Sequence, residues 1–391
     1  MGIAFGPLFA GPMSELYGRS PVYRVSYVFF WIFSWPVAFA PNISVFLIFR
    51  FITGFCCAAF LSVAGGSVSD IFAGHEVAIP TALYTTAPFI GPMLGPLIGG
   101  CVNQNTTWRW SYRLLLVWIF IEVLLIFGLV PETYEPALRK EKAKRIRKST
   151  GDSSFYAPLD KREGTLFLMI FVSCYRPFEL LFFDTMCLLL NLWTSIVFGI
   201  LYLTFQAYPY IFAVNHGFDI QSTGLAFIGL GIGMGMGTVT NIALIMYTHK
   251  QHPGVEPPPE ARLLTGEVGA VIVPLSLFWL AFTSYPHVHW IAPVIASSFF
   301  GVGFMLCFSS TFTYLVSAYR PMAASAMAAN AFARSSFAAA FPLFAGQMYT
   351  ALGTDGATAL LAGVMTIAAP LPFIFRRIGA RQRAKSRFAS H

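Results

Sequence analysis

Residues 91–100 read GPMLGPLIGG and lie inside an apolar run that extends over 77–101. About 20 apolar residues in helical conformation cross the hydrocarbon core of a bilayer, so this run is long enough to span a membrane. Gly91, Gly95 and Gly99 are four residues apart, and this spacing places them along one stripe of a helix. The stretch therefore predicts a membrane-spanning helix with a flat side against which another helix packs closely.

The composition of the whole chain extends this prediction to a polytopic membrane protein. Of the 391 residues, 56% are hydrophobic and 11% are charged, whereas soluble domains carry about 25% charged residues. These values exclude a soluble enzyme and a disordered chain, and they make the lipid bilayer the expected surroundings. The net charge of +8 forms no recognisable basic face, so nucleic acid is not an expected partner.

Apolar runs divide the chain into expected spans. Residues 1–13 are too short to cross a membrane and look like the second half of a helix. Ten full spans are expected at 22–40, 43–66, 77–101, 108–130, 186–213, 221–247, 264–284, 289–317, 323–350 and 356–376. Two six-helix halves would need one more helix and a longer first one, so we expect that the first helix and part of the second are missing from this chain.

The expected fold class is an all-α polytopic membrane protein built from two helix bundles. Residues 1–130 would be the incomplete N-terminal bundle, and 186–376 the C-terminal six-helix bundle. Between them, 131–185 reads as a basic cytoplasmic linker followed by a segment that lies along the membrane interface. Residues 377–391 read as a basic cytoplasmic tail.

The positions of the basic residues predict the orientation. Of the 25 Lys and Arg residues, 21 fall in alternate loops and the tail, and the loops expected on the opposite side contain none. Basic residues accumulate on the cytoplasmic side of membrane proteins. The linker and the tail are therefore expected in the cytoplasm.

Two motifs precede the glycine stripe. Gly11, Glu15, Gly18 and Arg19 form the pattern G-x-x-x-E-x-x-G-R in the first loop. A tight glycine turn beside a carboxylate and a guanidinium would let such charges pair across the two halves and separate again during a conformational change.

Arg50 and Gly54 form the second motif, R-x-x-x-G, inside the run 43–66. An arginine in an apolar helix is costly and is expected to face the bundle or a wet cavity; snorkelling to the interface is the alternative. An acidic partner would stay ionised beside it, and Glu122 and Asp70 are both candidates.

Together these motifs resemble those of the major facilitator superfamily. The first resembles the family's loop signature, with Glu15 in place of the usual Asp, and the second its R-x-x-x-G helix. The third resembles the antiporter motif G-x-x-x-G-P-x-x-G-G, here Gly91, Pro92, Gly95, Pro96, Gly99 and Gly100.

The chain is similar along essentially its whole length to fungal twelve-span drug:proton antiporters. This resemblance implies export of small organic compounds such as drugs, toxins or secondary metabolites. Export would be coupled to proton entry, with Arg50 and Gly54 in the coupling site, and would proceed by alternating access.

Five residues are expected in the substrate cavity. Asn330 and Arg334 share one face of a helix because they are four residues apart. Glu122 lies in the middle of a span, where it either binds a cationic substrate or pairs with another helix. Phe205 and Tyr208 offer an aromatic surface, either to substrate or to lipid.

No cofactor or metal site is expected, because the cysteines lack metal-ligand spacing and the glycines near 224–237 do not form a nucleotide motif. Asn42 and Asn105 lie in N-x-[ST] sequons of predicted exterior loops. Asn105 is the better expected glycosylation site, because the loop of Asn42 is too short to clear the membrane easily.

Three other functions compete with proton-coupled export. A facilitator-type importer of the same fold is disfavoured by the antiporter motif, and a membrane-embedded transferase by the lack of a polar catalytic cluster. A truncated, non-transporting remnant is the third. A monomer in the plasma membrane that binds protons and a small organic substrate is expected.

Overall fold

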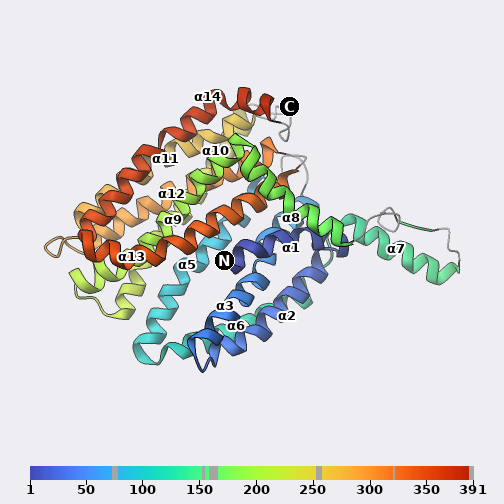
Figure 1. Cartoon of the computed structure of the whole chain (residues 1–391), viewed down its shortest axis with the longest axis horizontal. Coiled ribbons are helices and arrows are strands. Elements are labelled where there is room, and N and C mark those ends of the chain that lie inside the picture. Colours follow the sequence, from blue (N-terminus) through green and yellow to red (C-terminus); the bar gives the residue numbers. More distant parts are fainter. Residues whose placement is uncertain (73–77, 152–154, 158–165, 252–257, 320–321, 387–391) are drawn as a thin grey trace. The chain divides into compact units, whose positions relative to one another are not determined.

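The computed structural model describes residues 1–72, 78–151, 155–157, 166–251, 258–319 and 322–386. Every regular element in these ranges is helical (Figure 1), and the fold is all-α, as predicted. The chain divides into two compact units. Unit 1 comprises residues 1–80 and 112–179, and unit 2 comprises residues 81–111 and 180–391.

Eight helical stretches of the described chain are long and apolar enough to cross a membrane. They are Ile43–Ile71, Ile79–Asn105, Trp108–Leu129, Thr185–Asn215, Ile220–Tyr247, Pro259–Thr283, Ile291–Ala318 and Ser325–Ala384. Many of their large apolar side chains are exposed. Such exposure suits a lipid solvent, in which an apolar surface carries no hydration cost.

Unit 1 is built from seven helices and the start of α5. They are α1 (Gly2–Tyr17), α2 (Arg19–Ala38), α3 (Ile43–Cys57), α4 (Ala59–Ile71), α6 (Trp108–Leu129), α7 (Glu135–Thr150) and α8 (Leu166–Phe183). Helix α3 packs against both α1 and α2. Glycine permits the α1–α3 contact, because a Cβ atom at Gly2 would collide with the backbone oxygen of Phe51 and one at Gly6 with Ala58.

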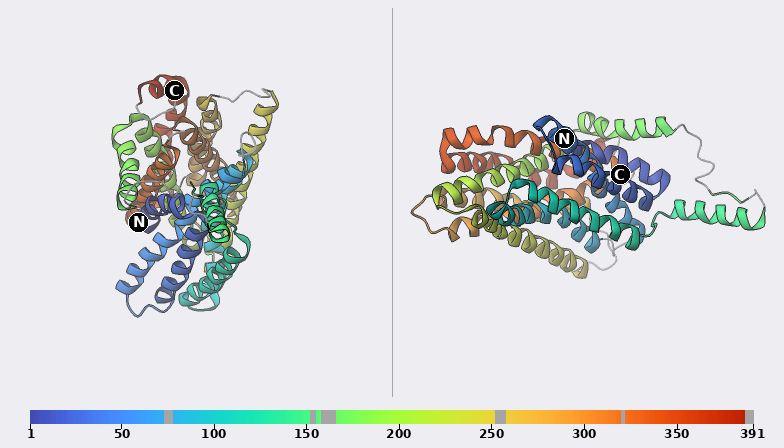
Figure 2. Two further views of the ribbon diagram at one scale, coloured as in Figure 1. Left: turned by 90° about the vertical axis from the view of Figure 1, so that its right-hand side faces the viewer. Right: turned by 90° about the horizontal axis from the view of Figure 1, so that it is seen from below.

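The predicted linker contains a helix that the sequence analysis did not anticipate. Helix α7 projects away from the other helices of unit 1 (Figures 1 and 2). Ion pairs join Glu135 to Arg139 and Glu141 to Arg145, each one turn apart, and such pairs support exposed helices. The linker residues 152–154 and 158–165 lie outside the described residues.

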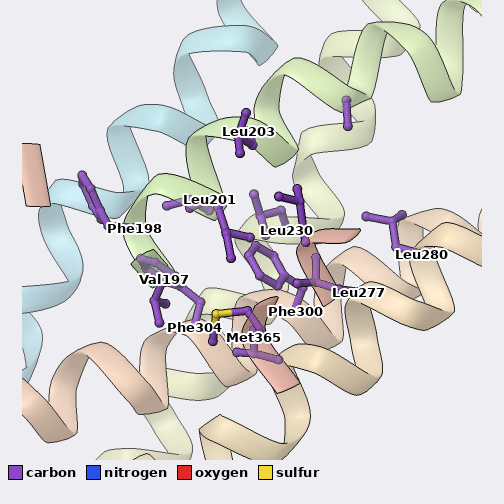
Figure 3. Packing of buried hydrophobic residues seen from close by; sticks show 14 of the residues in the cluster. Val197, Phe198, Leu201, Leu203, Leu230, Leu277, Leu280, Phe300, Phe304 and Met365 are labelled. Atoms are coloured by element: carbon purple, nitrogen blue, oxygen red, sulfur yellow. The ribbon is translucent and has the colours of Figure 1, made fainter. Parts of the chain in front are cut away.

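Unit 2 holds most of α5 and the six helices that follow α8. They are α5 (Ala78–Asn105), α9 (Thr185–Tyr208), α10 (Ile220–Gln251), α11 (Leu264–Thr283), α12 (Ile291–Ala318), α13 (Ala323–Ala368) and α14 (Pro370–Lys385). Helix α9 packs along α13, and α12 lies against both α10 and α11. Figure 3 shows the core, in which Leu230, Leu277 and Phe300 from three helices lie close together.

Four predicted spans differ in detail from the helices. The span at 43–66 is two helices that meet at Ala58, and the span at 186–213 ends in a π-helical turn, Pro209–Asn215. The last two predicted spans lie on α13 and α14, and the expected loop between them is a break at Gly353, where φ is 73°. Hydropathy marks these segments but does not locate a break of one residue.

Candidate functional site

Gly18 separates α1 from α2 in the loop motif. Its φ is 99°, a backbone conformation that glycine adopts without steric cost. A Cβ atom at this position would also collide with the carboxylate of Glu132. The predicted tight glycine turn is therefore present at Gly18, whereas Gly11 lies inside α1.

Arg19 is the centre of a polar cluster in unit 1. Its Nε donates to Asp70 Oδ2 over 3.0 Å, and its Nη1 donates to Ser14 Oγ over 2.6 Å. The guanidinium also lies 4.8 Å from the ring centre of Tyr134. Arg19 therefore pairs with Asp70 of α4 in the same unit, and the expected pairing across the two halves stays a prediction. Glu15 is exposed.

Glu132, three residues beyond α6, caps the start of α2. Its Oε1 accepts from the backbone N–H of Arg19 at 2.9 Å, and its Oε2 accepts from that of Ser20 at 3.2 Å. The first N–H groups of a helix lack intrahelical partners and carry partial positive charge, so a carboxylate there is favourable. The sequence analysis assigns Glu132 no role.

Arg50 lies on α3 with its guanidinium 5.6 Å from the ring centre of Tyr112. Of its two candidate partners, Asp70 is bound to Arg19. Glu122 accepts a hydrogen bond from Trp118 Nε1 at 2.7 Å. Arg50 therefore contacts the ring of Tyr112 and forms no ion pair within the described part of the chain.

Gly54, the second residue of that motif, lies where α3 approaches α1. A Cβ atom on Gly54 would lie 3.5 Å from Gly2 Cα and 3.5 Å from the backbone nitrogen of Ile3. These are ordinary van der Waals distances, so glycine here allows a close approach of two helix backbones.

The antiporter motif occupies the middle of α5. A Cβ atom on Gly91, Gly95 or Gly99 would meet no described atom within 4 Å, and close packing of this stripe against another helix stays a prediction. The close contact is made by the adjacent face, since a Cβ atom on Gly100 would lie 2.9 Å from the backbone oxygen of Ile220.

Two glycines of α10 extend this close contact with α5. A Cβ atom on Gly224 would lie 2.5 Å from the backbone oxygen of Pro96, and one on Gly231 would collide with Met93. Thr86 and Thr238 share a hydrogen bond of 3.0 Å. Pro88, Pro92 and Pro96 lie inside α5, which is continuous from Ala78 to Asn105.

Asn330 joins α13 to α9 inside unit 2. Its side chain is 1% exposed, and its Nδ2 donates to Asn191 Oδ1 at 3.0 Å and to Thr194 Oγ1 at 2.7 Å. The Thr194 hydroxyl donates to the Leu190 carbonyl, so its oxygen is an acceptor for Asn330. The Oδ1 atom of Asn330 has no partner among the described residues.

Arg334 lies one turn further along α13 and is 8% exposed. Its guanidinium carbon is 5.0 Å from the ring centre of Phe198 on α9 and 5.2 Å from that of Phe308 on α12. Phe89 of α5 packs edge-on against Phe308, with ring centres 4.7 Å apart. Figure 3 places Phe198 on the side of α9 nearest α5.

A polar cluster also closes the end of unit 2 at which α9 begins. Asp184 caps α9 by accepting from the N–H of Cys187 at 2.9 Å. It also accepts from the Tyr319 hydroxyl at 2.7 Å and from the hydroxyl of Ser386 beyond α14. Burial raises the pKa of the Tyr319 phenol, and the neighbouring negative charge of Asp184 raises it further. The phenol is therefore a hydrogen-bond donor at neutral pH.

Comparison with known proteins identifies the family. A sequence model of the Major Facilitator Superfamily matches residues 1–342. The chain belongs to the major facilitator superfamily. Chains of this family are membrane transporters, so the protein is a multi-pass membrane transporter and not an enzyme.

Several fungal members of the superfamily are similar over nearly the whole chain. "Efflux pump atB" of Aspergillus terreus is 46% identical, and the alignment covers 99% of this chain and 83% of that protein. "Probable drug/proton antiporter YHK8" of Saccharomyces cerevisiae is 40% identical over 99% of this chain and 76% of its own length. "Citrinin biosynthesis cluster MFS transporter mrr1" of Monascus ruber is 37% identical over 100% and 79%.

Two solved superfamily structures share the fold. The human organic anion transporter MFSD10 superposes with a TM-score of 0.65 at 18% identity, covering 96% of this chain and 80% of that one. The proton:xylose symporter XylE gives a TM-score of 0.66 at 16% identity, covering 96% and 84%. At these identities the likeness concerns the fold alone.

Three of the five predicted cavity residues, Tyr208, Glu122 and Phe205, contact other residues of their own unit. Tyr208 is fully buried in the core of unit 2, with its ring centre 4.0 Å from that of Phe227, and its place in a substrate cavity stays a prediction. Glu122 is half-buried and bonded to Trp118 of its own helix. Phe205 is half-buried between Tyr202 and Phe227.

The two predicted glycosylation sites lie at helix ends. Asn42 caps α3, and its Oδ1 accepts from the N–H of Val45 at 2.9 Å. Asn105 is the last residue of α5, where its Nδ2 donates to the Cys101 carbonyl at 2.9 Å. Both side chains are exposed, and their glycosylation stays a prediction.

Proposed function

We propose that this protein exports small organic compounds and that proton entry drives the export by alternating access. The observation that carries the proposal is the identity of 46% and 40%, over 99% of the chain, with proteins named as an efflux pump and a probable drug/proton antiporter. The substrates would be drugs, toxins or secondary metabolites, since other relatives are named for biosynthesis clusters.

The motif residues have distinct roles in this proposal. Arg50 and Gly54 belong to the proton-coupling site, where the fixed charge of Arg50 holds a carboxylate ionised until substrate or conformation alters the pairing. Glu122 is the candidate carboxylate in this chain, since Asp70 is bound to Arg19. The loop motif stabilises one conformation through Arg19 and Asp70, and Gly91 to Gly100 form the antiporter segment.

The proposal also covers the oligomeric state, the membrane and the domains. The protein acts as a monomer in the plasma membrane. The linker and interfacial segment at 131–185 separate the two helix bundles, and the tail 377–391 lies in the cytoplasm. Asn330, Arg334 and Phe205 contribute to substrate binding. A facilitator-type importer is the second candidate, and the direction of transport distinguishes the two.

The test measures loss of rhodamine 6G, 1-naphthoate and 1-naphthamide from a pump-deficient yeast strain that expresses the full chain. We expect faster loss of at least one compound, and we expect a protonophore to abolish the difference. Faster uptake that survives the protonophore would instead support the importer. Unchanged loss of all three compounds, with the protein present in the membrane, would contradict the proposal.

The role of Arg50 is tested in the same assay. Arg50→Ala is expected to abolish proton-driven export without loss of membrane insertion, because removal of an intramembrane charge makes insertion easier. Arg50→Lys is expected to rescue poorly, since an ammonium lacks the planar fork of a guanidinium. Arg145→Ala on the exposed face of α7 is the control, and export at the control rate by Arg50→Ala would remove Arg50 from the coupling site.

A further inference from the structure

Arg334 is a buried cation without a counter-ion in the described part of unit 2. It is 8% exposed, and its Nε atom has no hydrogen-bond partner. An arginine side chain stays protonated in proteins. A buried charge is costly unless another group compensates it, so the surroundings of Arg334 are informative.

The acidic residues of unit 2 do not provide that compensation. Five of them are described, and each has a recorded partner other than Arg334. They are Asp184 with Tyr319, Asp219 with Ser222, Glu260 with Arg383, Glu267 with Arg376, and Asp355 with Tyr285. Four of them lie at or near helix ends, and Asp355 lies beside the break at Gly353, whereas Arg334 lies eleven residues into α13.

Aromatic rings supply part of the compensation. Phe198 and Phe308 face the guanidinium at 5.0 and 5.2 Å, and the electron-rich face of a ring attracts a cation. Phe89 and Phe304 complete the wall, with ring centres 5.0 Å apart. These contacts involve ring faces, and the Nε–H group of Arg334 has no hydrogen-bond partner among the described residues, so it is available to an acceptor.

We propose that Arg334 binds the carboxylate of an aromatic organic acid, with Phe198 and Phe308 contacting its ring. This inference rests on the proposed function and names the substrate class. A guanidinium presents two parallel N–H groups that match the two oxygens of a carboxylate, and the phenylalanine wall suits a flat apolar body. The free Oδ1 of Asn330, one turn away, accepts a hydrogen bond from a hydroxyl substituent of such an acid.

A matched pair of ligands tests the proposal directly. The purified full chain in detergent is titrated with 1-naphthoate and with its neutral analogue 1-naphthamide, and the rise in unfolding temperature reports binding. We expect 1-naphthoate to bind at least about tenfold more tightly than 1-naphthamide, since charge-assisted bidentate hydrogen bonds are stronger than neutral ones. Equal affinity for the two compounds would overturn the proposal.

Substitutions locate the binding site. Arg334→Gln is expected to weaken 1-naphthoate about tenfold or more and to leave 1-naphthamide unchanged. Arg376→Gln, which removes the same charge from an exposed position on α14, is the control and should bind 1-naphthoate like the wild type. Wild-type affinity of Arg334→Gln for 1-naphthoate would refute the role of Arg334.

A second variant covers the case in which Arg334→Gln does not fold. Phe308→Leu retains the charge and removes one ring from the guanidinium. It should weaken 1-naphthoate more than cyclohexanecarboxylate, which has the same charge and no aromatic ring. Equal losses for both acids would contradict the aromatic part of the proposal.

The binding assay separates this inference from the proposed function. A protein that binds 1-naphthoate through Arg334 but moves no compound in cells would refute export and leave the acid site in place. A protein that exports rhodamine 6G but does not distinguish 1-naphthoate from 1-naphthamide would refute the acid site and leave export in place.

Discussion

Gly18 has a φ of 99°, and this single torsion lets the first turn of α2 approach the carboxylate of Glu132. The backbone N–H groups of Arg19 and Ser20 donate to that carboxylate, while the side chain of Arg19 reaches Asp70. One carboxylate thus orders the backbone of α2 and another orders its first side chain. The loop motif depends on two acids that lie outside the motif.

Substitution of Glu132 tests this dependence. Glu132→Gln removes the negative charge at the start of α2 and should lower the free energy of unfolding by about 1–2 kcal/mol. Glu135→Gln is the control, because its exposed pair with Arg139 contributes at most about 1 kcal/mol. Thermal unfolding of the purified variants measures both, and equal shifts would show that Glu132 contributes no more than a surface charge.

At this scale the sequence located charged residues more reliably than their partners. Arg19 and Arg334 were both assigned to sites because a charge in an apolar or glycine-rich setting is conspicuous. Asp70 and Glu132 are 51 and 113 residues away from Arg19, and tertiary packing decides such distant pairs. Both acids follow apolar spans, and this position is a signal that could have pointed to them.

At the scale of helices, α5 presents two faces with different environments. Gly100 lies against Ile220 and Gly224 of α10, whereas a Cβ atom on Gly99 would meet no described atom within 4 Å. The hydropathy of residues 77–101 predicted the helix, and helical periodicity predicted a stripe of Gly91, Gly95 and Gly99. Periodicity alone does not say which stripe a neighbour contacts, because that depends on how the neighbouring helix is placed.

Two adjacent alanine substitutions test this assignment. Gly100→Ala places a Cβ atom 2.9 Å from the Ile220 oxygen and should destabilise the protein by about 1–3 kcal/mol. Gly99→Ala should be neutral or stabilise it by up to about 1 kcal/mol, because alanine favours a helix more than glycine does. Unfolding of both variants in detergent gives the comparison, and similar effects of the same sign would refute the assigned contact face.

Helix α7 was missed although its sequence carries a helical signal. The charge of the segment predicts a linker, whereas its Glu-x-x-x-Arg pairs, which begin at 135 and 141, are typical of an exposed helix. Pro136 near its start and Gly151 at its end, with φ of 70°, are typical helix boundaries. A polar helix contains no apolar run, so hydropathy does not indicate it.

For the whole molecule, the distribution of basic residues predicts one orientation in the membrane. An epitope inserted after Gly151, beyond α7, is expected to stay inaccessible to antibody in intact spheroplasts and to become accessible after permeabilisation. The untreated wild type is the control for background staining. Staining of intact cells at this position would reverse the predicted orientation.

The fold as a whole was predicted from composition, spacing and motifs, because lipid restricts spanning chains to few architectures. The grouping of the helices was less accessible. Residues 81–111 fall in unit 2 with the C-terminal helices, although chain order places α5 in the first half. The contacts of Gly100 and Thr86 with α10 decide this grouping, and they join segments over 100 residues apart.

The break at Gly353 has a consequence for the choice of insertion sites in this protein. Helix α13 runs from Ala323 to Ala368 with this one non-helical residue, and the nearby Asp355 accepts from the Tyr285 hydroxyl at 3.1 Å. The last two spans are therefore joined at a single non-helical glycine. A reporter inserted here would interrupt the helical stretch, and the segment between α11 and α12, at 284–290, is the better place for an insertion.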